Sequence, residues 1–233
     1  MPCALFGKIQ TKRDFIAPGA PRAFLDRWEP WMQAGLATSR MMLDRAWQER
    51  FLTAPIWRFW LGERICGQAI AGAFMPSLDA VGRYYPLAGL GFAPAGGATP
   101  PPDIDPQEEW FAALEDFLLS TLDPATDWET TMAALAALPS PAALAPTAPS
   151  AQMTPAGANG FMTPIDDASP RSVFEALMQA DWAATHAERC CLWTAGGPDF
   201  RPVAISTQGL PGPEIFVGLL TGDFRAAGAA VPA

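Results

Sequence analysis

Charged residues are scarce in this sequence, and basic residues are the scarcer kind. Asp, Glu, Lys and Arg make up 17% of the 233 residues, and the formal net charge is −9. No basic stripe is present that could neutralise the phosphates of nucleic acid or bind an anionic membrane surface. We therefore expect neither nucleic acid nor a membrane surface to be a partner.

Ligands for metal ions are equally few. The chain has a single histidine, His186, and four cysteines without a CxxC pair. Such a set offers no convincing metal site, and free thiols are typical of the cytosol. Cys190 and Cys191 are adjacent, so on a strand one thiol would face the core and the other would face outward. We expect no metal and no other cofactor.

Signals for export or membrane insertion are not apparent. Residues 1–7 lack a basic stretch followed by a long apolar one, and nowhere do about 18 apolar residues follow one another. We expect the chain to be neither exported nor inserted into a membrane by signals of its own.

Motifs of nucleophilic and nucleotide chemistry are missing as well. There is no G-x-S-x-G elbow, no P-loop and no dinucleotide-binding fingerprint. The only imidazole, His186, lies just past a predicted helix and one turn after Trp182, where it would stabilise the helix end or pack on the neighbouring ring. We predict that the chain is not an enzyme.

Hydrophobic residues, by contrast, make up half of the chain, which is ample for a continuous core. In the region 21–38 they recur at helical spacing, at Phe24, Trp28, Trp31 and Gly35. This predicts an amphipathic helix that Pro30 kinks or splits. A second helix is predicted over 41–52, and its buried face would consist of Met42, Leu43, Ala46 and Trp47.

Short aromatic and aliphatic runs bounded by Gly or Pro predict strands. These runs are 56–61, 68–75, 84–92, 190–194, 203–207 and 215–220. Further helices are predicted over 105–122, 127–138 and 169–184, the first of them capped by Asp105 and Pro106. This order predicts an α+β fold, in which a central, mainly antiparallel sheet carries helices on both faces.

One domain is predicted over 1–225. Within it, the Pro- and Ala-rich stretch 139–164 has almost no charge and too few large side chains to hold a regular element, so we interpret it as a surface excursion. Residues 226–233 are predicted to be a flexible C-terminal tail.

The segment 75–87, MPSLDAVGRYYPL, should fold as a strand, a turn and a strand, so that the runs on either side of it pair as neighbours. The Asp79 side chain can accept a hydrogen bond from the backbone two residues later in the chain. The planar guanidinium of Arg83 can donate two hydrogen bonds to a carboxylate. In a functional interpretation, a polar cluster lines a groove and consists of Ser77, Asp79 and Arg83 with Lys8, Arg13 and Asp14 of the amino-terminal loop. In the structural interpretation, which we favour, Arg83 bonds Asp79 or Asp14 and holds two loops together.

Nine tryptophans are present, and exposed aromatic residues are common anchors of protein interfaces. Trp57 and Trp60 are three positions apart on one predicted strand, so they should face opposite sides of the sheet. One of them could then point outward, which would allow a partner or a homodimer to bind. Burial under a neighbouring helix is the simpler interpretation.

The order and spacing of several short motifs resemble those of the TagF (ImpM) family. These motifs are Phe6-Gly7-Lys8, Arg13-Asp14-Phe15, Trp31-Met32-Gln33-Ala34-Gly35-Leu36, Ser39-Arg40, Thr53-Ala54-Pro55-Ile56-Trp57-Arg58-Phe59 and the segment 75–87. The resemblance is dense from Cys3 to about Ala93 and returns weakly over 192–197 and 209–211. It departs from the family at Ile9-Gln10 and Arg13, where members commonly have Leu-Pro and Gly, so the loop here has less freedom to adopt positive φ.

The resemblance implies a role in the bacterial type VI secretion system. TagF-like proteins are cytoplasmic, post-translational repressors that engage the forkhead-associated scaffold protein of the apparatus and oppose its assembly. A different class of function stays open from the residues alone: a small-molecule or nucleotide-binding regulator, or a hydrolase that uses Ser77, Asp79 and Arg83. A concave pocket in which two of these side chains converge would favour that alternative.

Overall fold

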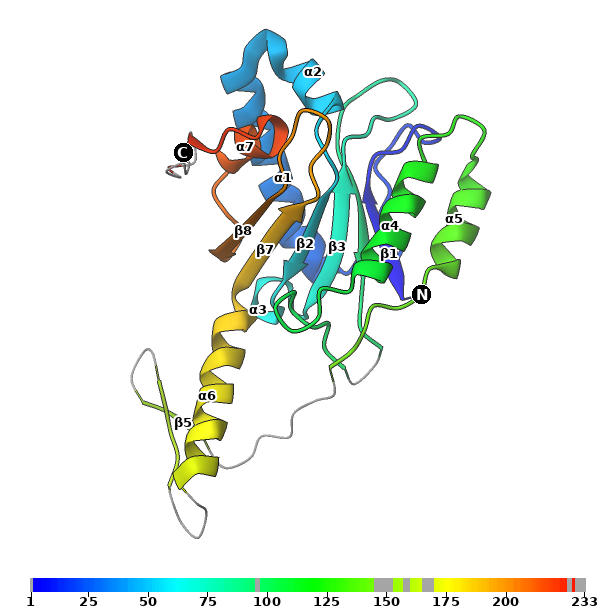
Figure 1. Ribbon diagram of the computed structural model, residues 1–233. Helices are drawn as coiled ribbons and strands as arrows, with labels where there is room; N and C mark the ends of the chain where they lie inside the picture. Colours follow the sequence, from blue (N-terminus) through cyan, green and yellow to red (C-terminus); the bar gives the residue numbers. More distant parts are fainter. Residues whose placement is uncertain are drawn as a thin grey trace.

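A six-stranded antiparallel sheet forms the centre of the molecule (Figure 1). The computed structural model describes residues 2–94, 97–144, 153–156, 160–164, 170–225 and 228. The strands lie in the order β1-β4-β3-β2-β7-β8. Their bounds are β1 Cys3–Gly7, β2 Trp57–Leu61, β3 Ile70–Met75, β4 Leu87–Gly91, β7 Arg189–Thr194 and β8 Val203–Gln208. With helices on both faces of this sheet, the predicted α+β fold is confirmed.

Consecutive hairpins build most of the sheet. β2, β3 and β4 pair in chain order, and the predicted pairing of β3 with β4 through the segment 75–87 is confirmed. β7 then adds to β2, and β8 adds to β7. β1, which pairs with β4, was not predicted from the sequence. All five of its residues are buried, so it shows no alternation of apolar and polar positions.

One face of the sheet is covered by α1 (Arg22–Leu43), α2 (Trp47–Leu52) and α7 (Ile215–Thr221). The predicted stripe of α1 packs on this face, where the ring of Trp28 lies 4.5 Å from that of Phe59 between centroids. Pro30 lies inside α1 and does not split it. Because α1 runs past the predicted end, the region 41–52 is not one helix: a 3₁₀ turn, η1 (Asp44–Ala46), separates α1 from α2.

The buried face predicted for 41–52 is therefore largely wrong. Met42 is 47% exposed and Ala46 is exposed, whereas Trp47 and Phe51 are buried. The turn at Asp44, where φ is 45°, changes the direction of the chain, so one helical stripe does not continue through it.

The region 215–220 forms α7, so the prediction of a strand there is wrong. Six of its seven residues are buried, and a short apolar run buried on all sides cannot be assigned to strand or helix by periodicity. Its flanks identify the helix: Pro213 lies just before its start, and Gly222 ends it with φ at 76°.

The other face is covered by α4 (Glu108–Ser120) and α5 (Trp128–Ala137). The helix predicted over 127–138 is confirmed as α5, and Asp127 caps it by accepting a hydrogen bond from the Thr130 N–H at 2.7 Å. Asp105 does not cap α4. Its carboxylate accepts from the Gln107 N–H at 2.9 Å in a local turn, and Gln107 adopts φ 49° before the helix begins.

α6 (Pro170–Ala187) leads into β7 and projects from the body of the molecule (Figure 1). Beside it lie two short paired strands, β5 (Thr154–Pro155) and β6 (Phe161–Met162). The prediction that 139–164 holds no regular element is wrong for these residues. β6 packs against α6, and this contact supplies packing that the stretch itself lacks. The remaining short helix, α3 (Glu63–Cys66), follows β2.

Several predictions fall on residues outside the described part. They concern Ser169, part of 139–164, and all of the predicted tail except Gly228. In the described ranges, no helix combines the length and the apolar character that crossing a lipid bilayer requires.

Candidate interaction surface

The Asp79 carboxylate joins two loops at one end of the sheet. Its Oδ2 accepts from Lys8 Nζ at 2.7 Å and from Arg83 Nε at 2.7 Å, and its Oδ1 accepts from the backbone N–H groups of Val81 and Arg83 at 3.0 and 2.9 Å. A guanidinium nitrogen of Arg83 also donates to the carbonyl of Arg13. The bond that the structural interpretation predicted is thus present, with Asp79 rather than Asp14 as the partner of Arg83.

Electrostatics fixes the charge of Asp79. Burial alone would raise the pKa of its carboxyl group, but the hydrogen bonds from Lys8, Arg83 and Val81 hold this pKa well below its ordinary value. The carboxylate has no exposed surface. It is therefore a charged anchor inside the loops rather than a group that a substrate could reach.

The six predicted cluster residues divide into two sets. Lys8, Ser77 and Asp79 are buried. Arg13, Asp14 and Arg83 are exposed. The structure brings these residues into one neighbourhood but leaves only the second set accessible.

Trp57 and Trp60 face opposite sides of β2, as predicted, but neither points outward. Trp57 is 1% exposed and donates its indole N–H to the Leu219 carbonyl of α7 at 2.9 Å. Trp60 is 4% exposed and donates to the Thr99 carbonyl at 3.0 Å. Burial, the simpler interpretation, is therefore confirmed, and the alternative that one ring points outward is wrong, because elements on each face cover the rings and satisfy their N–H groups.

A third segment completes the neighbourhood of Asp79. Tyr84 packs edge-on against the rings of Trp47 and Phe51, at 5.8 and 5.7 Å between centroids. Its hydroxyl accepts a hydrogen bond from the Gln48 amide. The segments 8–16, 40–52 and 76–86 are thereby held together, and we call them the basic end of the molecule (Figure 1).

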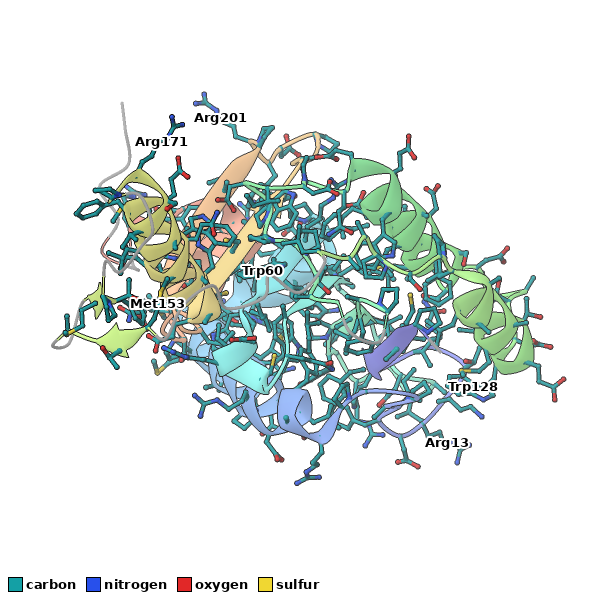
Figure 2. All side chains as sticks on the ribbon, turned by 90° about the horizontal axis from the view of Figure 1, so that it is seen from below. Arg13, Trp60, Trp128, Met153, Arg171 and Arg201 are labelled. Carbon is teal, nitrogen blue, oxygen red and sulfur yellow. The ribbon has the colours of Figure 1, made fainter. Side chains whose placement is uncertain are left out.

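Seven of the fifteen basic residues of the chain lie in the basic end, together with only four acidic residues. They are Lys8, Lys12, Arg13, Arg40, Arg45, Arg50 and Arg83. The Lys8 ammonium pairs with the buried Asp79 carboxylate. All five arginines are exposed, although Arg83 also pairs with Asp79. Figure 2 shows Arg13 pointing outward on the side of Trp128, whose ring lies 4.8 Å from Lys12 Nζ. The chain as a whole is acidic, so this concentration of positive charge distinguishes the basic end.

Large apolar side chains are exposed among these arginines. They are Phe15 (46% exposed), Met41 (77%), Met42 (47%), Leu52 (48%) and Val81 (57%). Sequence reasoning identified Arg13 and Arg83 but missed the part contributed by 40–52. The sequence did contain a signal for this segment. Arg40, Arg45 and Arg50 are five residues apart, so they cannot all lie on one buried face of a helix.

A hollow with a volume of about 380 Å³ lies elsewhere, on β7 and β8. Its lining includes Trp193, Ala204 and Ser206 with Pro102, Pro106 and Glu108. The polar cluster around Asp79 does not line this hollow, so the pocket geometry that would favour a hydrolase at Ser77, Asp79 and Arg83 is not found there.

Comparison with known proteins identifies the family. Residues 4–138 match the family model of the TagF N-terminal domain, described as type VI secretion system-associated. The crystal structure of PA0076 from Pseudomonas aeruginosa PAO1 is similar over 99% of this chain and 97% of that one, with a TM-score of 0.76 and 28% sequence identity. No curated protein matches the sequence. The family match covers more than half of the chain, and this protein therefore belongs to the TagF family of type VI secretion system-associated proteins.

Proposed function

We propose that this chain is a non-enzymatic, cytoplasmic accessory protein of the type VI secretion system, which represses the apparatus after translation by binding its forkhead-associated scaffold protein. Membership of the TagF family supports the pathway. Repression and the scaffold partner rest on the family resemblance of the sequence.

The observation that carries the proposal is the basic end. Its loops are held by the buried Asp79 carboxylate, and its exposed surface combines five arginines with five large apolar side chains. Interfaces are enriched in arginine and in large apolar residues, and a preformed surface loses little conformational entropy on binding. The same contacts disfavour catalysis by the Ser77, Asp79 and Arg83 cluster, because Asp79 is used internally.

The proposed test is a binding titration of the full-length chain with its cognate forkhead-associated scaffold protein. Arg13→Glu and Met41→Glu change exposed side chains of the basic end, and each should weaken binding at least about tenfold, as expected for interface residues. Both substitutions lie on the surface, so the variants should keep the wild-type melting temperature.

Matched controls lie on α6. Arg171→Glu and Met178→Glu make the same chemical changes at exposed positions away from the basic end, and both should bind the scaffold as the wild type does. Equal weakening by the two pairs, or no complex with the wild type, would contradict the proposal.

A further inference from the structure

The two edges of the central sheet are protected differently. The edge formed by β1 is covered by the chain itself: the Leu5 N–H donates to the Pro18 carbonyl at 3.1 Å, and Gly7 and Ile16 exchange hydrogen bonds of 3.1 and 2.9 Å. At the edge formed by β8, the described residues provide no such backbone partner. β8 also carries no charged residue and no proline, which are the usual means of blocking an edge.

The pairing register shows which backbone groups of β8 are free. Glu188 lies opposite Gly209 in the β7–β8 register, and the Gly209 N–H donates to the Glu188 carbonyl at 2.7 Å. Bonded and non-bonded pairs alternate in an antiparallel ladder, so Val203, Ile205 and Thr207 bond β7. The backbone N–H and C=O groups of Ala204, Ser206 and Gln208 consequently point away from the sheet.

Two of these residues, Ala204 and Ser206, also border the hollow of about 380 Å³. α4 and α5 cover this face of the sheet over the other strands but leave β8 open (Figure 1). At β7, the ring of Trp193 packs against that of Phe111 of α4, at 4.9 Å between centroids. Ala204 and Ser206 are small, and the half-buried ring of Trp193 forms part of the lining. A strand added at β8 would therefore find room for large apolar side chains on this face.

The stretch 103–109, whose Glu108 lines the hollow, forms an acidic wall beside it. The stretch 103–109 contains Asp103, Asp105, Glu108 and Glu109 and no basic residue. The side chains of Asp103 and Glu108 are 54% and 66% exposed, although Glu108 also pairs with Arg58 and Asp103 lies 3.2 Å from the His186 ring nitrogen Nε2. Arg201 precedes β8 and points away from the molecule in Figure 2. The wall thus favours positive charge on whatever occupies the hollow.

We infer that β8 binds an extended segment of a partner protein, which adds to the sheet as a further strand. Ala204, Ser206 and Gln208 supply the backbone hydrogen bonds, the hollow accepts large apolar side chains of the segment, and the acidic wall binds its Lys or Arg residues. This site lies apart from the basic end and goes beyond the proposed function.

A second copy of this chain is a poorer occupant. If two copies paired antiparallel through β8, Ala204, Ser206 and Gln208 of one copy would lie opposite the same residues of the other. These side chains are small or polar, so they would leave the hollow unfilled. Each copy also carries a formal net charge of −9, which opposes association.

Selection from a random twelve-residue peptide library on the full-length chain tests the inference. The enriched peptides should alternate large apolar residues with others and carry Lys or Arg. Ser206→Pro removes one outward N–H without breaking a bond to β7 and should weaken their binding at least about tenfold, since a backbone hydrogen bond is lost and the proline ring blocks pairing. Ser206→Ala keeps the N–H and should bind as the wild type.

A second measurement does not depend on the Ser206→Pro variant. Hydrogen exchange of the wild type with the best peptide should slow at the amides of Ala204, Ser206 and Gln208, and replacing the Lys or Arg residues of the peptide by Glu should abolish this protection. The inference is overturned if no peptide is enriched, if the enriched peptides are acidic, or if β8 stays unprotected. It is also overturned if the wild type sediments as a dimer and Ser206→Pro as a monomer, because the second copy is then the occupant.

Discussion

At the scale of single residues, buried charges are used to fix loops and helices. Asp79 holds the two loops of the basic end. Arg58 similarly joins β2 to α4, through two hydrogen bonds of 2.6 and 3.1 Å to Glu115 and a further one to Glu108. Burial would lower the pKa of Arg58, but its bonds to Glu115 and Glu108 raise it, so this side chain stays charged.

Because of Asp79, the free energy of unfolding should depend on pH in the acidic range. A carboxyl group whose pKa is lower in the native state than in the unfolded chain stabilises the fold fully above the unfolded pKa, near 3.8, and this stabilisation is lost as the pH falls below it. The free energy of unfolding should therefore fall as the pH is lowered from about 4 to about 2. Asp79→Asn should reduce this slope in urea titrations.

Val81→Ala serves as the control for that experiment, because it changes an exposed side chain in the same loop and retains the carboxylate. It should keep the wild-type slope. If Asp79→Asn unfolds with the wild-type dependence on pH, the role given to this carboxylate is wrong.

Phe59 should be among the most sensitive core positions. Its ring is fully buried and contacts the rings of Phe24, Trp28 and Phe74. Phe59→Ala should lower the free energy of unfolding by about 4 kcal/mol, through lost burial and the cavity that it leaves. Phe174→Ala, at a position 58% exposed on α6, should cost less than about 0.5 kcal/mol in the same denaturant titration. Similar losses at the two positions would show that β2 does not lie in the core as described.

At the scale of elements, segments with a helical stripe or with clear turn residues on both sides were predictable. α1 shows the helical stripe, and β2, β3 and β4 are bounded by turn residues, so all four were identified. β1 and α7 are short and buried on all sides, so their patterns carry no period. The assignment of α7 required Pro213 and Gly222 to be considered together as the flanks of a helix.

The contact between α1 and α7 depends on the absence of a side chain at Gly35. A Cβ atom placed there would lie 2.0 Å from the Phe216 ring, and Phe216 is buried, so the ring has little room to move. Gly35→Ala should therefore destabilise the protein by about 2 kcal/mol despite the higher helix propensity of alanine.

Gly197→Ala is the matched control, since a Cβ atom there would meet nothing within 4 Å. It should leave the melting temperature nearly unchanged. A wild-type melting temperature for Gly35→Ala would contradict the close packing of α1 on α7 at this position.

At the scale of the whole molecule, charge is distributed unevenly. Seven basic residues gather at the basic end of a chain whose net charge is −9, while the stretch 103–109 is entirely free of them. Some residues of the basic end could be identified from the sequence, because Asp79 and Arg83 lie in the same turn segment, 75–87. The spacing of the arginines in 40–52 indicates that they are not all buried, but the position of this segment beside the other two depends on Tyr84 packing against Trp47 and Phe51, which the sequence does not show.

Binding at the basic end should depend on salt. Exposed arginines attract a partner electrostatically, and dissolved salt screens this attraction. The Debye length is about 10 Å at 0.1 M ionic strength. Affinity for the scaffold protein should fall several-fold between about 0.05 and 0.3 M salt, and mainly through a slower association rate. Surface-plasmon measurements at several salt concentrations check this, and a constant association rate would indicate that the arginines take no part.

Hydrogen exchange of the full-length chain, measured with and without the cognate forkhead-associated scaffold protein, tests the central claim most directly. The account predicts slower exchange in the segments 8–16, 40–52 and 76–86 when the scaffold is bound. Protection confined to other segments, or the same exchange with and without the scaffold, would contradict it.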